Sequence, residues 1–259
     1  MAEGWNIVVC VKQVPDADDV SIDPETGRLN RSDAEAVLNA PDYNAVEAAL
    51  ALRESAGGTV TALSMGPPNA DAVLRVAVGM GADDGVLLTD PAFGGSDTWP
   101  TSLALARAAA ELDADVVIGG EESTDSSTGQ VPPGIAAHNG WAQLTYVEEL
   151  EARPDEDRLV ARRDIEGGYE RVAADLPVVV AMGFGENDPR PAGLHRKIFA
   201  ETDFEPTQWT AEDIGVEGEV GLAVSPTQVG GMDTAEPVPR EKETVETSDR
   251  LAERIAEVL

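Results

Sequence analysis

The sequence contains a single cysteine, Cys10, and only two histidines among its 259 residues. One cysteine cannot form an internal disulfide, and these residues offer no metal-ligand cluster of a recognised spacing. Any redox chemistry must therefore come from a bound cofactor. The sequence also lacks a basic and apolar leader, and it has no apolar run near the ~20 residues that a membrane helix needs. We expect a cytoplasmic protein without a membrane span.

Positive charge is scarce, because 18 lysine and arginine residues face 49 aspartate and glutamate residues, for a formal net charge of -31. Only Lys12, Lys197 and Lys242 are lysines. Such a surface repels nucleic acid and anionic lipid headgroups, so we expect neither as a partner. The acids are spread over the whole chain, which is typical of haloarchaeal proteins in a salt-saturated cytoplasm. Regularly spaced apolar runs disfavour the alternative, a disordered acidic chain.

Two phosphate-binding motifs are absent. Neither GxGxxG nor GxxxxGK[ST] occurs, which disfavours a standard dinucleotide fold and a P-loop NTPase. The first predicted strand runs into residues 12–16 without a pyrophosphate loop of serine and glycine. We therefore expect no ATP hydrolysis and assign no catalytic residue.

Short β-branched runs alternate with longer Ala-rich amphipathic stretches over the first two-thirds of the chain. This pattern predicts βαβ units in a Rossmann-like α/β fold with an open, mostly parallel sheet, similar to the adenine nucleotide alpha hydrolases. The expected strands are 5–11, 59–64, 85–89, 115–118, 159–163, 169–173 and 178–182. The expected helices are 43–56, a helix opened by Pro67 and Pro68, 101–112 and 135–139.

The character of the sequence changes near residue 185, beyond which Pro, Gly and Glu dominate and periodicity fades. We therefore expect a nucleotide-binding α/β domain over residues 1–184 and an extended arm over residues 185–259. The arm ends in a short amphipathic helix with Ser248 as its N-cap. Its apolar stripe consists of Leu251, Ile255 and Val258. The arm either packs on its own domain or wraps a partner, and we favour the partner.

The most informative segment is the loop GGEESTDSSTGQVPPG at residues 119–134, between an apolar strand and a helical segment. In an open parallel sheet, ligands collect beyond the carboxyl ends of the strands. The backbone amides and hydroxyls of this loop can form an anion nest for phosphate, while distant acids are screened beyond ~10 Å. An ordinary polar loop that caps a helix explains the same residue types.

Eight blocks of the sequence carry a resemblance to a known family. They are VVCVKQVPD (8–16), NAPDYNAVEAAL (39–50), LSMGPP (63–68), GMGADDGVLL (79–88), the loop 119–134, RDIEGGYE (163–170), NDPRPAGL (187–194) and VGLAVSPTQV (220–229). In this order they resemble the β subunit of the electron transfer flavoproteins, a family that includes the FixA-type proteins. The blocks run over nearly the whole chain, so the resemblance is specific.

The resemblance implies a heterodimer with the α subunit of an electron transfer flavoprotein, which holds the redox-active FAD. This chain would shield that flavin and bind a second adenine nucleotide, either AMP or a second FAD. Electrons would pass from acyl-CoA dehydrogenase-type donors, as in fatty acid oxidation, to a quinone oxidoreductase acceptor at the membrane. The chain would then be an electron-transfer component and no stand-alone enzyme. A flavin-free nucleotide-sensing module is the alternative from another class.

The resemblance also implies nucleotide contacts at strand ends and helix starts along one edge of the predicted sheet. They are Cys10, Asn39, Ala40, Pro41, Asp42, Met65, Gly120, Glu121, Glu122, Ser123, Thr124, Asp125, Ser126, Ser127, Thr128, Gly129, Gln130 and Val131. Simpler roles stay open for four of them. Cys10 and Met65 could be core packing, and Asn39 and Asp42 could be helix caps.

Two further residues are implied as partner contacts. Leu194 resembles the apolar anchor that such proteins offer to dehydrogenases, with a buried arm residue as the simpler interpretation. Asp164 resembles an acid that faces the flavin domain of the α subunit, with a solvated strand carboxylate as the simpler interpretation.

The chain departs from the family pattern in the loop. The departures are Glu121, Ser123, Thr124 and Pro132. The acid at Glu121 removes a possible partner for phosphate. Another group of residues is similar to the FixA and electron-bifurcating branch, whose β subunit holds a second FAD in place of AMP. This group consists of Asp42, Asn44, Ala45 and Glu47.

Overall fold

The computed structural model describes residues 4–16, 21–22, 29–30, 36–185, 187–227 and 247–258. The main sheet of these residues has nine strands. In order across the sheet they are β11 (Gly168–Asp175), β10 (Arg158–Ile165), β9 (Ala142–Arg153), β12 (Val178–Met182), β8 (Val116–Gly120), β1 (Trp5–Cys10), β6 (Gly58–Met65), β7 (Asp84–Leu88) and β13 (Thr207–Trp209). From β9 to β13 in this order every pair is parallel, whereas β10 is antiparallel to both of its neighbours. The predicted α/β class with an open, mostly parallel sheet is confirmed.

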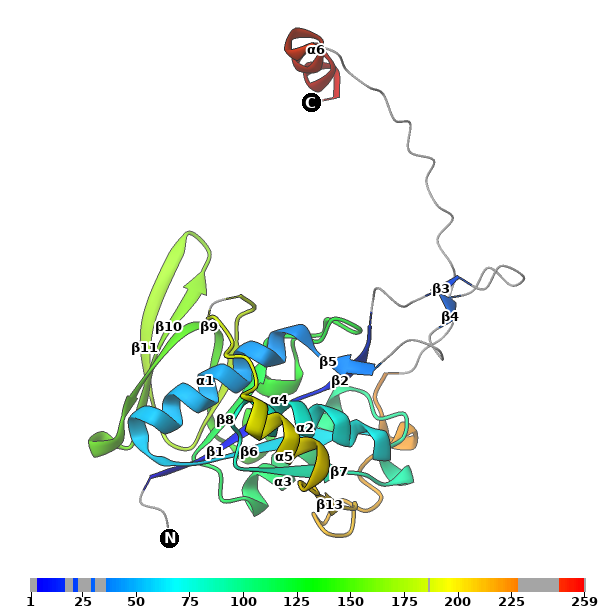
Figure 1. Cartoon of the computed structure of the whole chain (residues 1–259), viewed down its shortest axis with the longest axis vertical. Coiled ribbons are helices and arrows are strands. Elements are labelled where there is room, and N and C mark those ends of the chain that lie inside the picture. Colours follow the sequence, from blue (N-terminus) through cyan, green and yellow to red (C-terminus); the bar gives the residue numbers. More distant parts are fainter. Residues whose placement is uncertain are drawn as a thin grey trace.

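Helices cover both faces of this sheet (Figure 1). They are α1 (Ala40–Ala56), α2 (Asp71–Met80), α3 (Thr98–Glu111), α4 (Val131–Asn139) and α5 (Leu194–Thr202). A further helix, α6 (Ser248–Val258), lies near the end of the chain. Successive residues of a strand point to opposite faces. Ile7 and Val9 of β1 accordingly belong to the core under α1 and α2, and Val8 belongs to the core under α3 and α4.

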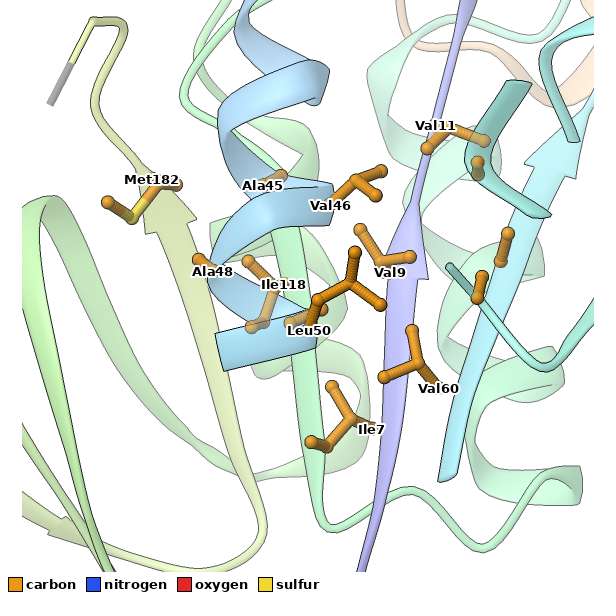
Figure 2. Packing of buried hydrophobic residues seen from close by; sticks show 14 of the residues in the cluster. Ile7, Val9, Val11, Ala45, Val46, Ala48, Leu50, Val60, Ile118 and Met182 are labelled. Atoms are coloured by element: carbon orange, nitrogen blue, oxygen red, sulfur yellow. The ribbon is translucent and has the colours of Figure 1, made fainter. Parts of the chain in front are cut away.

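Helix α1 is fixed by apolar packing and by a start and a stop signal in the sequence. Pro41 lies in its first turn, where the missing N–H costs no helical hydrogen bond, and Gly57 ends it with a φ of 74°. Figure 2 shows Val46 and Leu50 of this helix beside Val9 of β1, and all three are buried. Burying one such side chain stabilises the fold by about 1.5–3 kcal/mol.

A topological switch point lies between β1 and β8. β1 leads to α1 on one face of the sheet, whereas its neighbour β8 leads to α4 on the other. The register aligns Cys10 of β1 with Gly119 of β8. Connections that leave on opposite faces open a crevice at the carboxyl ends of the two strands, which is where ligands bind in open α/β sheets.

Shorter elements complete the described chain. Two small antiparallel sheets pair β2 (Gln13–Pro15) with β5 (Ala36–Leu38) and β3 (Ser21–Ile22) with β4 (Leu29–Asn30). The 3-10 helices are Pro68–Ala70, Pro91–Phe93, Pro154–Glu156 and Leu222–Val224. The first of these leads directly into α2, so the helix predicted after Pro67 and Pro68 is confirmed.

The antiparallel ribbon of β9, β10 and β11 contains a strand that the sequence pattern does not predict. In β9, two residues separate the buried Leu144 and Val147, and one of them, Tyr146, has a φ of 55°. This β-bulge breaks the two-residue alternation by which a strand is recognised. The turn predicted at residues 166–168 joins β10 to β11, with Gly167 at a φ of 87°.

Residues 187–220 return to the α/β domain. Asn44 of α1 donates from Nδ2 to Asn187 Oδ1 at 2.7 Å, and Arg190 donates from Nε and Nη2 to the carboxylate of Glu47, each at 2.8 Å. Helix α5 then packs against α2, and β13 adds a strand beside β7. This stretch of the predicted arm therefore packs on its own domain. Wrapping of a partner stays a prediction for the later residues.

Helix α6 follows Thr247, whose Oγ1 accepts a hydrogen bond from Arg250 N at 3.4 Å. Thr247 thus occupies the capping position that the sequence analysis assigns to Ser248. Leu251 and Ile255 of its predicted stripe are about half-exposed. The Val258 side chain and residues 228–246 of the predicted arm lie outside the described residues. In the described part of the chain, no helix is long and apolar enough to cross a membrane.

Candidate functional site

The ends of β1 and β8 and the start of α1 meet at the switch point. Cys10 is the last residue of β1, Gly120 is the last residue of β8, and Asn39 directly precedes α1. Residues 121–130 form a loop that leads into Val131, the first residue of α4. The structure therefore brings these predicted site residues to one edge of the sheet.

The side chain of Asp42 ties these segments together. It is 4% exposed and accepts hydrogen bonds from Lys12 N at 2.7 Å, Asn39 Nδ2 at 3.0 Å and Gly120 N at 3.2 Å. The three donors replace water around the buried carboxylate, and its place in the first turn of α1 favours negative charge. We call Asp42 with these three donor residues the Asp42 node. Its carboxylate binds two main-chain N–H groups and the side chain of Asn39, and the nucleotide contact that the resemblance implies for Asp42 stays a prediction.

Gly120 allows this close approach because it has no side chain. A Cβ at position 120 would lie 2.4 Å from Asp42 Oδ1 and 2.8 Å from Pro41 Cβ. Neither group can move away, because both belong to the buried first turn of α1. The glycine in the predicted loop thus serves the packing of α1 on β8.

Burial governs protonation in this region. Desolvation raises the pKa of Asp42 to about 7, against the lowering effect of the hydrogen bonds from Lys12, Asn39 and Gly120. Desolvation and the charge of Asp42 raise the pKa of Cys10 to about 12. The Cys10 thiol is therefore protonated at neutral pH and is a small, unreactive surface at the end of β1.

Asn39 connects the Asp42 node to the loop. Its side chain donates from Nδ2 to Glu122 O and accepts at Oδ1 from Thr124 N, both at 3.0 Å. Within residues 36–56, its side chain makes no capping hydrogen bond to α1. Asn39 is therefore a link between α1 and the loop, and the simpler interpretation of a helix cap is wrong for this side chain.

The loop itself folds into a compact turn. Ser127 and Gly129 have φ values of 45° and 61°. Ser123 O accepts a hydrogen bond from Ser127 N at 2.8 Å, and Ser123 Oγ lies 2.7 Å from Ser126 Oγ. Left-handed residues turn neighbouring amides toward one side, which is the backbone geometry of an anion nest.

Lys12 is a site residue that the sequence analysis does not assign. Its Nζ lies 2.7 Å from Asp125 Oδ1, 3.1 Å from Ser123 Oγ and 3.5 Å from Ser126 Oγ. Desolvation raises the pKa of Asp125, but hydrogen bonds from Lys12 and Ser123 outweigh it and hold the pKa below its usual range. Two features of the sequence point to this residue: lysine is rare in the chain, and Lys12 directly follows the first predicted strand.

The other predicted residues lie at several places around this edge. Met65 ends β6 and packs, partly buried, on the core under α3 and α4. Desolvation, Glu122 and Asp164 together raise the pKa of Glu121, so Asp164 of β10 lies near the loop. Leu194 begins α5 and is 71% exposed, which excludes the interpretation as a buried arm residue.

A hollow of about 340 Å³ lies elsewhere, on the ribbon of β9, β10 and β11. Charged side chains line it, and they pair with one another: Arg162 with Glu149 at 3.2 Å and Arg171 with Glu151. A ligand would have to displace these pairs. Among the described residues, no group of three or more His, Cys, Asp or Glu is arranged to hold a metal ion. The candidate site is therefore the edge at β1 and β8.

An open, mostly parallel sheet with helices on both faces and a glycine- and hydroxyl-rich loop at its switch point defines a Rossmann-like α/β protein. The electron transfer flavoprotein domain matches residues 26–208 of the chain. The chain belongs to the electron transfer flavoprotein family, which confirms the resemblance.

Three relatives illustrate the range within this family. The chain is 46% identical over 232 residues to the electron transfer flavoprotein subunit beta of Clostridium acetobutylicum, covering 89% of this chain and 88% of that protein. It is 40% identical over 226 residues to the caffeyl-CoA reductase-Etf complex subunit CarD of Acetobacterium woodii, covering 86% and 85%. It is 38% identical over 249 residues to protein FixA of Sinorhizobium fredii, covering 93% and 86%.

Proposed function

We propose that this chain is the β subunit of a heterodimeric electron transfer flavoprotein and binds an adenine nucleotide at the edge of β1 and β8. The observation that carries the proposal is the Asp42 node, which joins Lys12, Asn39 and Gly120. Three segments that are far apart in the sequence thereby meet at one switch point, beside a loop rich in hydroxyls and amides.

In this proposal the chain holds and shields cofactors, and the FAD of the α subunit supplies the electron transfer. Asn39 fixes the loop through Glu122 O and Thr124 N. The loop amides and hydroxyls then bind phosphate. Cys10, protonated and partly buried, offers a small contact at the end of β1.

The proposed partners are the α subunit, acyl-CoA dehydrogenase-type donors and a quinone oxidoreductase acceptor. Helix α5 supports the docking role of its first residue, because Leu194 and Ile198 are spaced by one turn and are 71% and 50% exposed. Asp164 lies on the exposed ribbon near Glu121, which is compatible with a contact to the α subunit.

A second FAD in place of AMP is the variant that the resemblance to the FixA and electron-bifurcating branch raises. The relatives named FixA and CarD are 38% and 40% identical to this chain. Three of the residues that resemble this branch also make hydrogen bonds within the chain. Asp42 forms the node, Asn44 binds Asn187, and Glu47 binds Arg190. We propose an adenine nucleotide in either case, because AMP is also a moiety of FAD.

The test is to co-express the chain with a family α subunit, purify the complex and count FAD and AMP released by acid. A yellow heterodimer with one FAD and one AMP supports the proposal in its AMP form, and two FAD without AMP supports the variant. The α subunit purified alone is the control, because it gives the flavin content that does not depend on this chain. A colourless monomer under saturating FAD would contradict both forms.

A further inference from the structure

The ammonium group of Lys12 reaches from the end of β1 into the loop. It uses all three of its protons, toward Asp125 Oδ1 at 2.7 Å, Ser123 Oγ at 3.1 Å and Ser126 Oγ at 3.5 Å. Two hydroxyls and one carboxylate thus surround the cation with oxygen atoms, and the contact with Asp125 has the length of a charge-assisted hydrogen bond.

Among the described segments that form this edge, Lys12 is the one cation. The segments that form the site, residues 4–16, 39–42 and 119–131, contain a single basic residue, Lys12. The loop contributes Glu121, Glu122 and Asp125 instead. An anionic ligand therefore needs Lys12 to offset the nearby carboxylates, because backbone dipoles act only over about one turn.

The ion pair between Lys12 and Asp125 is easily broken. The side chains of Lys12 and Asp125 are 44% and 32% exposed, so the pair is hydrated and contributes little to stability. The backbone of the loop does not depend on it, because Ser123 O binds Ser127 N and Asn39 binds Glu122 O and Thr124 N. A phosphate carries more charge and more acceptor oxygens than one carboxylate, so it can replace Asp125.

We propose that Lys12 binds the phosphate of the nucleotide and that Asp125 forms an ion pair with the ammonium group of Lys12 while the site is empty. This inference rests on the proposed nucleotide site and adds a residue and a competing internal anion to it. Asp125 acts as an internal competitor, so its charge lowers the affinity for phosphate-bearing ligands.

The test measures binding of AMP and of adenosine to the full chain by equilibrium dialysis at constant ionic strength. Lys12→Gln should weaken AMP binding about tenfold, the effect of one charge-assisted contact, and leave adenosine binding unchanged. Asp125→Asn should tighten AMP binding about threefold, again without an effect on adenosine. In the Lys12→Gln/Asp125→Asn double variant, Asp125→Asn should no longer tighten AMP binding, because the two residues act through one contact.

Two further variants control for charge and folding. Arg107→Gln removes an exposed positive charge from α3 and should bind both ligands as the original chain does. Lys12→Arg keeps the charge and should keep AMP affinity within about threefold.

The inference is overturned if Lys12→Gln binds AMP normally, if it loses adenosine as strongly as AMP, or if Asp125→Asn weakens AMP binding. If the original chain binds neither AMP nor FAD, the proposed nucleotide site falls and this inference falls with it. Failure of the Lys12 and Asp125 variants alone leaves the nucleotide site standing.

Discussion

The Asp42 node and the ribbon of β9, β10 and β11 are stabilised by opposite means. The node contains one buried carboxylate that accepts three hydrogen bonds, two of them from main-chain amides. The ribbon carries exposed ion pairs, such as that of Arg171 with Glu151. Water can replace a partner on the ribbon, but it cannot reach the node. In a chain with 49 acidic residues, burial is therefore a better guide to stability than the number of ion pairs.

The largest effect is expected for Asp42→Ala. This substitution leaves three donors, from Lys12, Asn39 and Gly120, in a buried place without their acceptor. We expect the free energy of unfolding to fall by about 3 kcal/mol, since each unsatisfied buried donor costs roughly 1–3 kcal/mol and removal of the buried charge offsets part of the sum. Urea unfolding followed by tryptophan fluorescence measures the change.

Asp97→Ala is the matched control. Asp97 also accepts three hydrogen bonds, from Trp99 N at 2.9 Å, Thr227 N at 2.7 Å and Thr227 Oγ1 at 2.6 Å. Asp97 is the N-cap of α3 and is partly exposed, so water can take over its hydrogen bonds in the variant. The free energy of unfolding should therefore fall by only about 1 kcal/mol. If Asp42→Ala and Asp97→Ala lower the free energy of unfolding equally, burial does not determine what a hydrogen-bonded carboxylate contributes to stability in this chain.

A smaller effect is expected from pH. Desolvation raises the pKa of Asp42 to about 7, above its usual value of 3.8. The folded state therefore binds this proton more tightly than the unfolded state does, so the free energy of unfolding should rise as pH falls through 7. Between pH 8 and pH 6 the gain should be about 1.4 kcal/mol. Urea unfolding at the two pH values measures it.

Asp42→Asn isolates this contribution, because the variant cannot titrate at position 42 and its stability should change less between pH 8 and pH 6. Carboxylates with lowered pKa values do not interfere in this window. Asp213, whose pKa is lowered by hydrogen bonds from Thr210, loses its contribution only at acid pH. Identical slopes for the variant and the original chain would refute the assignment to Asp42.

The sequence predicts those parts of the fold whose signals are local. β1 and α1 follow from a β-branched run and from helical spacing ended by Gly57. β9 is not predicted because the bulge at Tyr146 interrupts its alternation of buried and exposed residues. β13 is not predicted because its three residues are too few to show such an alternation. Both strands are held by pairing with neighbours that are distant in the sequence.

The same distinction applies to the candidate site. The loop at the end of β8 is predictable, because composition and position suffice. The hydrogen bond of Gly120 N to Asp42 spans 78 residues, and the contact of Lys12 with Asp125 spans 113. Such contacts depend on the relative position of β1, α1 and β8, which no local pattern encodes.

The smallest effect is expected on the ribbon. Arg171→Gln and Glu151→Gln remove an ion pair whose arginine side chain is 61% exposed. A double-mutant cycle should give a coupling energy of about 0.5 kcal/mol or less, because solvent screens the pair and both long side chains lose rotamer freedom in forming it. Molar KCl should abolish the coupling. A coupling energy as large as the loss expected for Asp42→Ala would mean that surface ion pairs do hold this acidic chain together, and the contrast between node and ribbon would be wrong.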